Sequence, residues 1–217
     1  NPDLDGDGED YHTDTDDQDP DGTRMDMGAY YHHQLPTVDS SSTVLISPNG
    51  SDYGLVNAYY YNSNTWETLS DITGGIDEWW GTSAYDVESD KIILFEYDGT
   101  GFVSTRAYDY NTDTWEEKTA VSGIDEWWGT SAYDVESDKV ILIEFNSSNS
   151  ATTWSYDYNT DTWEERNTID GMYSSWGASA YDWQSDKTIL LNVNGSGGVS
   201  TKAYDYDNNS WENKTTY

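Results

Sequence analysis

Cysteine is absent from the 217 residues, and phenylalanine, proline and basic residues are scarce. Without cysteine the chain has no disulfide scaffold, no thiol nucleophile and no thiolate zinc site. Its apolar runs are far shorter than the ~20 residues that a helix needs to cross a bilayer, so we expect no membrane insertion.

The shortage of basic residues leaves the chain strongly acidic. Nine Lys and Arg side chains face 42 Asp and Glu, which gives a net charge of −33. A surface of this sign repels phosphate, so binding to nucleic acids or anionic membranes is not expected. The charge also opposes compaction unless cations screen it.

Aromatic residues, in contrast, are abundant. The chain has eleven Trp and nineteen Tyr but three Phe. Disordered acidic chains are poor in aromatics, so this composition predicts a folded protein. Because most of the aromatic side chains carry a polar atom, they suit half-buried strand positions and exposed binding faces.

Residues 1–28 hold eleven of the acidic side chains in a spacing typical of calcium loops. Alternate aspartates, a glycine at the sixth position and a closing aspartate bring oxygen ligands around one hard cation. A second, weaker match overlaps the first; a solvated acidic tail is the alternative. The predicted calcium ligands are Asp3, Asp5, Asp7, Glu9, Asp14, Asp17, Asp19 and Asp21.

The same segment resembles the calcium-binding repeats of thrombospondin type 3 and dockerin modules, without the cysteines of the animal versions. This resemblance implies an extracellular or cell-surface protein with a calcium-ordered segment. No signal peptide is visible at Asn1-Pro2-Asp3, which we interpret as the start of a processed chain or of a fragment.

The remaining residues form a repeat of about 48 residues. Residues 77–91 recur unchanged as 125–139, and a third, more divergent copy follows. A repeat of this length and composition is typical of propeller blades. We therefore predict an all-β domain over 29–217 with four-stranded repeats at about 29–76, 77–124, 125–172 and 173–217.

The second repeat shows the expected strands most clearly, at about 82–87, 91–97, 104–110 and 114–118. The apolar run 92–95 predicts a strand buried on both faces, whereas the mixed run 106–110 predicts a more exposed strand. A tryptophan recurs at a fixed place in each repeat and is predicted to pack between blades. These residues are Trp66, Trp115, Trp163 and Trp211.

An apolar strand followed by Tyr-x6-Trp, as in Tyr108 and Trp115, resembles a kelch-type β-propeller blade. The resemblance covers about residues 32–217 and implies a kelch-like β-propeller of four blades. One departure is clear: Glu96 and Tyr97 stand where kelch blades carry Gly-Gly. Three arrangements stay open: a closed four-bladed ring, part of a longer ring, or copies joined head to tail.

Catalytic candidates are few. The histidines are His12, His32 and His33, outside the regular repeats, and no serine has a nucleophile-elbow context. The acid pairs at 77–78 and 125–126 recur identically, which favours repeated binding or solvation over a single catalytic pair. We therefore expect a protein that is not an enzyme.

The same loops hold the predicted ligand-binding residues, in which a carboxylate adjoins an aromatic plate suited to sugars. They are Glu78, Trp79, Glu126 and Trp127. An exposed row of tryptophans is equally suited to a protein interface, and their neighbours Trp80, Trp128 and Trp176 are predicted to pack between blades. Five sequons predict glycosylation, at Asn49, Asn146, Asn194, Asn208 and Asn213.

Two functions fit these features. The first is an extracellular or cell-surface structural protein, stabilised by calcium, that associates with itself or with other surface proteins as a filament, surface layer or adhesin module. The alternative is a lectin-like propeller that binds glycans with the repeated Trp and acid loops.

Overall fold

The computed structural model describes residues 42–48, 53–73, 81–97, 101–124, 129–146, 149–172, 177–193 and 198–215. Seventeen strands and the turns between them make up these residues, and no helix occurs among them. The predicted all-β class is therefore confirmed. No helix within the described ranges is long and apolar enough to span a membrane.

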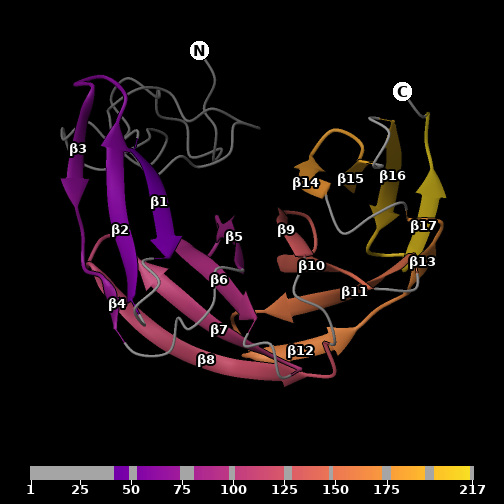
Figure 1. Ribbon diagram of the computed structural model, residues 1–217, viewed down its shortest axis with the longest axis horizontal. Coiled ribbons are helices and arrows are strands. Elements are labelled where there is room, and N and C mark those ends of the chain that lie inside the picture. Colours follow the sequence, from indigo (N-terminus) through magenta and orange to yellow (C-terminus); the bar gives the residue numbers. More distant parts are fainter. Residues whose placement is uncertain are drawn as a thin grey trace, which may run out of the picture. The chain divides into compact units, whose positions relative to one another are not determined.

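The strands form four antiparallel sheets (Figure 1). Sheet 1 contains β1 (Ser42–Pro48), β2 (Tyr53–Tyr60), β3 (Thr65–Thr68) and β4 (Ile72–Thr73). Sheet 2 contains β5 (Gly81–Asp86), β6 (Lys91–Tyr97), β7 (Phe102–Asp109) and β8 (Thr114–Ser122). Sheet 3 contains β9 (Gly129–Asp134), β10 (Lys139–Phe145), β11 (Ser150–Asp157), β12 (Thr162–Glu165) and β13 (Ile169–Asp170). Sheet 4 contains β14 (Gly177–Asp182), β15 (Lys187–Val193), β16 (Val199–Asp205) and β17 (Ser210–Asn213).

The chain divides into two compact units. The first contains Asn1–Leu45 and Asn57–Glu67, and the second contains Ile46–Val56 and Thr68–Tyr217. The second unit thus holds sheets 2, 3 and 4 complete, and it is described by itself below.

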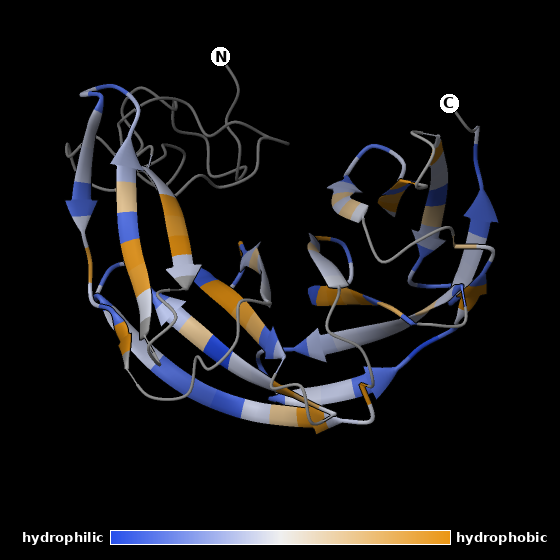
Figure 2. Cartoon of the chain, in the orientation of Figure 1, coloured by the Kyte–Doolittle hydropathy of each residue, from blue (hydrophilic) through white to orange (hydrophobic). Residues whose placement is uncertain are grey.

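Sheet 2 follows the sequence pattern closely, because its four strands begin and end within a few residues of the predicted positions. Ile93, Leu94 and Phe95 of β6 are buried on both faces, as predicted, while Ile92 is half-buried, and Figure 2 shows this run as hydrophobic. The expectation for β7 was wrong. Arg106, Ala107 and Tyr108 are all buried, because sheet 3 packs on the face that carries Ala107 and the arginine pairs with a buried carboxylate on the other.

Each sheet of the second unit has two distinct faces. The face that carries Leu94 in sheet 2 is called the A face, and the face that carries Phe95 is called the B face; strand alternation places every second residue on the same face. The B face of sheet 2 packs on the A face of sheet 3, where the Phe95 ring lies 5.9 Å from Tyr156 and 4.9 Å from Trp163. The B face of sheet 3 packs in the same way on Leu190 and Tyr204 of sheet 4.

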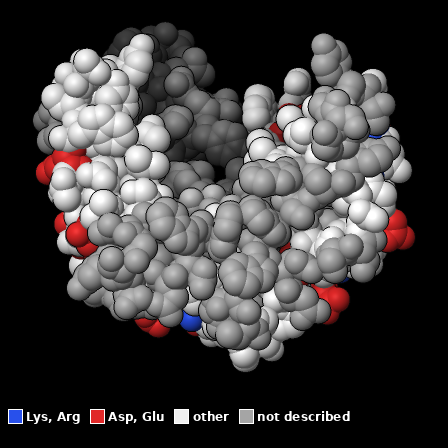
Figure 3. Space-filling model, viewed as in Figure 1, with Lys and Arg blue, Asp and Glu red and all other residues white. Residues whose placement is uncertain are grey.

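Charged side chains stay at the surface with few exceptions. On the side drawn in Figure 3, acidic side chains are scattered over the described surface and basic ones are sparse. One lysine of each repeat in the second unit pairs with an aspartate of the same sheet: Lys91 with Asp109, Lys139 with Asp157 and Lys187 with Asp205. These pairs are partly exposed and offset little of the net charge.

Candidate functional site

Polar contacts at one end of the strands join each sheet to the segment that ends the preceding repeat. The two ends of the strands are called the two edges of the sheets. Asp161 of sheet 3 accepts hydrogen bonds from the Tyr156 hydroxyl at 2.8 Å and from the backbone N–H and hydroxyl of Thr119, both at 2.9 Å. The indole N–H of Trp163 donates to the Thr119 carbonyl oxygen at 2.9 Å. This set of contacts is called the staple.

The staple recurs at the neighbouring sheets. Asp113 accepts from Tyr108 and Ser70, and Trp115 donates to the Ser70 carbonyl oxygen. In sheet 4, Asn209 accepts from Tyr204 and from the backbone of Asn167, to whose carbonyl oxygen Trp211 donates. The prediction that these tryptophans pack between repeats is therefore confirmed for Trp115, Trp163 and Trp211, and their role is structural.

The opposite edge of the sheets carries polar residues that differ from repeat to repeat. The first strand of sheets 2, 3 and 4 (β5, β9 and β14) begins there with a glycine. The cross-strand partners of these glycines are Glu96 for Gly81, Glu144 for Gly129 and Asn192 for Gly177. These three partners are all buried. This edge is called the loop edge, because the chain enters β5 and β9 here directly after the predicted Trp-Trp ligand segments.

At the loop edge of sheet 2, Glu96 is buried beside a cation. The Arg106 guanidinium donates to Glu96 Oε2 at 2.5 Å, the Ser104 hydroxyl lies 3.4 Å from the same oxygen, and Glu117 contacts the guanidinium from the solvent side. Glu96 Oε1 is buried and has no hydrogen-bond partner among the described residues. Burial raises the pKa of the Glu96 carboxyl to about 7, because the loss of hydration outweighs the attraction of Arg106.

This pKa has a consequence for stability. Between the ordinary pKa of 4.5 and about 7, folded Glu96 binds a proton that the unfolded chain does not, so stability falls as the pH rises through this window. We expect Glu96→Gln to remove about 2 kcal/mol of pH dependence between pH 5 and 7, measured by urea unfolding. Glu116→Gln, which alters an exposed carboxylate of the same sheet that pairs with Lys118, is the control and should keep the wild-type slope. An unchanged slope in Glu96→Gln would contradict this assignment.

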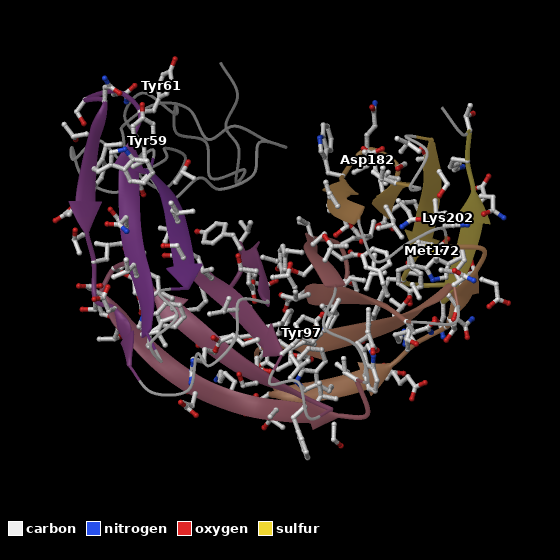
Figure 4. The ribbon with its side chains drawn as sticks, viewed as in Figure 1. Tyr59, Tyr61, Tyr97, Met172, Asp182 and Lys202 are labelled. Atoms are coloured by element: carbon white, nitrogen blue, oxygen red, sulfur yellow. The ribbon has the colours of Figure 1, made fainter. Side chains whose placement is uncertain are left out.

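Tyr97 lies at the junction of sheets 2 and 3 (Figure 4), with its ring against Gly129. Its hydroxyl is buried and has no partner among the described residues. Burial, and then the nearby Glu144 carboxylate, raise the pKa of the phenol far above its ordinary value, so Tyr97 stays a hydrogen-bond donor at any physiological pH. Glu144 itself accepts a hydrogen bond from the Trp154 indole at 3.2 Å.

The next junction has the same geometry with different chemistry. Phe145 takes the place of Tyr97 against Gly177, Asn192 replaces Glu144, and Lys202 replaces Trp154. Burial lowers the pKa of the Lys202 ammonium, which donates to the Asn213 side chain at 2.7 Å. The junction of sheets 2 and 3 is thus distinguished by a buried phenol donor and the buried Glu144 carboxylate close to the loop edge, whereas Glu96 lies on the opposite, A face of sheet 2.

Most of the predicted site residues lie outside the described residues. This holds for all the predicted calcium ligands, for the predicted ligand-binding residues and for two of the sequons. They are Asp3, Asp5, Asp7, Glu9, Asp14, Asp17, Asp19, Asp21, Glu78, Trp79, Glu126, Trp127, Asn49 and Asn194. Within the described ranges, no group of three acidic or histidine side chains is placed to hold a metal ion.

Three sequon asparagines are described. Asn146 accepts hydrogen bonds from Ser150, and Asn213 accepts one from Lys202, both through the side-chain oxygen. Asn208 is exposed on a turn and donates to Asp205 at 2.8 Å. Glycosylation at these positions stays a prediction.

Sequence reasoning did not predict Glu96, Tyr97 or Glu144 as functional residues. The sequence did carry a signal, since these residues occupy the positions at which a kelch blade has Gly-Gly. Glu96 and Tyr97 are much larger than the two glycines of the kelch pattern. Their presence indicates that the neighbouring sheet leaves space for a large side chain. Gly129 provides that space for Tyr97.

No protein-family model matches the sequence, and no curated protein matches it. Solved structures show the fold. TolB from Acinetobacter baumannii matches with a TM-score of 0.54 and 15% identity over 80% of this chain and 41% of its own. The SapL1 lectin in complex with alpha methyl fucoside matches with a TM-score of 0.54 and 10% identity over 81% of this chain and 65% of its own. AofleA from Arthrobotrys oligospora matches with a TM-score of 0.51 and 9% identity over 83% of this chain and 59% of its own. The chain therefore spans about two fifths to two thirds of these proteins, and its fold is of the β-propeller-like, all-β kind that they share.

Proposed function

We propose that this protein is a glycan-binding, lectin-like β-propeller whose binding site lies at the loop edge, at the junction of sheets 2 and 3. The observation that carries the proposal is the buried Tyr97 Oη, which has no partner among the described residues and lies near the Glu144 carboxylate at this junction. A buried polar atom without a partner is costly, and a ligand hydroxyl group relieves that cost.

The chemistry of this edge suits a sugar. A phenol donor and carboxylate acceptors match the hydroxyl groups of a neutral saccharide, and the predicted Trp-Trp segments that directly precede Gly81 and Gly129 supply aromatic surface for stacking. The lectin among the structural neighbours supports this class of ligand over the self-assembling structural role, for which the comparisons offer no support. The calcium segment, the extracellular location and the absence of catalysis stay predictions.

The test is a glycan array followed by calorimetry on the strongest binder. We expect the double substitution Trp79→Ala and Trp127→Ala to weaken binding at least about tenfold, because each aromatic plate contributes contact area to the sugar. Tyr97→Phe, which deletes only the unpartnered hydroxyl, should weaken it about five- to tenfold.

Trp183→Ala is the matched control, because Trp183 is exposed on a turn at the opposite edge of sheet 4 and should not affect binding. Absence of binding by the wild-type chain to every glycan tested, or an equal loss in the Trp183 variant, would overturn the proposal.

A further inference from the structure

The junctions between sheets 2 and 3 and between sheets 3 and 4 use the same kinds of residue. Sheet 4 carries the residues of one side of such a junction, and sheet 1 carries those of the other side. We propose that one copy of this chain docks head to tail on a second copy through these two sides. The proposal is independent of glycan binding. The contacts of this interface occur twice within the second unit, and residues at the two ends match them.

The tail surface consists of Leu191, Val193, Lys214 and Thr215. Leu191 and Val193 lie on the B face of sheet 4 and are 45% and 40% exposed, whereas their counterparts in sheet 3, Ile143 and Phe145, are 0% and 2% exposed. The sequence therefore places apolar residues on this face as it does on the faces that are covered by a following sheet. Burial along β15 alternates residue by residue, because sheet 3 covers the A face of this strand and its B face is more exposed.

The polar part of the tail surface is already in the conformation that the inner junctions use. The backbone N–H of Lys214 donates to Thr201 at 2.8 Å, as that of Arg166 donates to Thr153 at 2.7 Å. Lys214 pairs with Glu212 as Arg166 pairs with Glu164. Thr215 stands where Thr119 and Asn167 stand in the preceding repeats, four residues after the repeat tryptophan, and it is exposed.

The inner junctions show what these two residues contact. Lys118 lies over the Tyr158 ring at 4.3 Å, and the guanidinium of Arg166 lies over the Tyr206 ring at the same distance. The residue that follows each cation, Thr119 or Asn167, forms the staple with the next sheet. By analogy, Lys214 would lie over a tyrosine ring of the partner. Thr215 would form a staple with an asparagine or aspartate and a tryptophan of the same partner.

The head surface offers these three groups. It consists of Tyr61, Asn64 and Trp66, all within the first unit. Asn64 has the same left-handed backbone as Asp161, with φ of 52° against 53°, and accepts the Tyr59 hydroxyl at 2.9 Å. The Tyr59 and Trp66 rings lie 5.0 Å apart, as do those of Tyr156 and Trp163.

The head surface lacks the cover that its counterparts have. Trp66 is 59% exposed and Tyr61 is 75% exposed, whereas Tyr158, Trp163 and Trp211 are half-buried. Figure 4 shows Tyr61 at the tip of the turn between β2 and β3. The head surface of a second copy therefore offers a tyrosine for Lys214, a staple partner for Thr215 and the Trp66 ring for Leu191, as Phe95 contacts Trp163 at the inner junction.

The experiment is sedimentation velocity on the full chain at low and at about 2 M NaCl, because a net charge of −33 on each copy opposes association until salt screens it. We expect the wild-type chain to form dimers or larger species, with the assembled fraction increasing with salt. Leu191→Lys blocks the tail surface and Trp66→Ala blocks the head surface. Each variant alone should assemble at least about tenfold more weakly.

The decisive measurement is a mixture of the two variants. Because the contact is heterologous, the intact head of the Leu191 variant fits the intact tail of the Trp66 variant, and the mixture should form a two-chain complex that grows no further. Far-UV circular dichroism of each variant confirms folding, and Trp183→Ala, at an exposed site outside both surfaces, should assemble like the wild type. A wild-type chain that stays monomeric at high salt, variants that assemble normally, or a mixture that forms no complex would each overturn the proposal.

Discussion

Replacing Asp161 by alanine is expected to lower the free energy of unfolding by about 3–4 kcal/mol, the largest effect among the single substitutions considered. The change removes the acceptor for three hydrogen bonds, from Tyr156 and from the backbone and hydroxyl of Thr119. It also places alanine at a φ of 53°, which an aspartate tolerates better. The loss is measured by urea unfolding followed by tryptophan fluorescence.

The chain provides its own control for this substitution. Sheet 4 has Asn209 at the same place, where the amide oxygen accepts from Tyr204 and from the Asn167 backbone. Asp161→Asn should therefore cost less than about 1 kcal/mol at neutral pH. Equal losses in the two variants would show that the charge, and not the acceptor geometry, holds the staple together.

Acid distinguishes the same two variants. Burial alone would raise the pKa of Asp161, but the hydrogen bonds from Thr119 and Tyr156 outweigh it and hold the pKa below its ordinary value. A lowered pKa in the folded state gives stability that is present above the unfolded pKa and is lost as the pH falls through the folded one. Stability of the wild type should thus fall more steeply below about pH 4 than that of Asp161→Asn.

The second large effect is expected at Gly129. A β-carbon added there would overlap the Tyr97 hydroxyl and would lie 3.0 Å from the Ile143 carbonyl oxygen, so Gly129→Ala should cost about 2–3 kcal/mol in unfolding free energy. The Tyr97 ring is fully packed between sheets 2 and 3 and has little room to withdraw.

A double-mutant cycle isolates the cause. Tyr97→Ala removes the ring that the new methyl group meets, so Gly129→Ala should cost less than about 1 kcal/mol in that background, with the remainder caused by the Ile143 oxygen. If the two losses simply add, the glycine is required for a reason other than the tyrosine.

The sequence alone predicted the repeat, the strand positions and the packing role of Trp115, Trp163 and Trp211, because strand alternation and fixed spacing are local properties. It did not predict the burial of β7, since the partner of Arg106 is Glu96 of β6, across the strand pair. Nor did it identify the polar loop edge, because the hydroxyl of Tyr97 is buried by a contact with Gly129 of the following repeat. A contact between residues this far apart in the sequence is not visible in a local pattern. The periodicity of the sequence therefore predicted the repeats themselves but not the side-chain contacts between them.

The near identity of the repeats has a consequence for how the chain folds. Strands β6 and β10 have similar sequences and the same register with their partners, so β6 and β11 could pair in much the same way as the native strands. Such exchanges between neighbours trap repeat proteins during folding. Sheet 4 differs from the other two, however, because Asn192 stands where they have Glu96 and Glu144, so β15 paired with β7 would bring an amide instead of a carboxylate to Arg106. Asn192 therefore disfavours pairing of β15 with the wrong partner, and refolding of the Asn192→Glu variant should be slower and less complete.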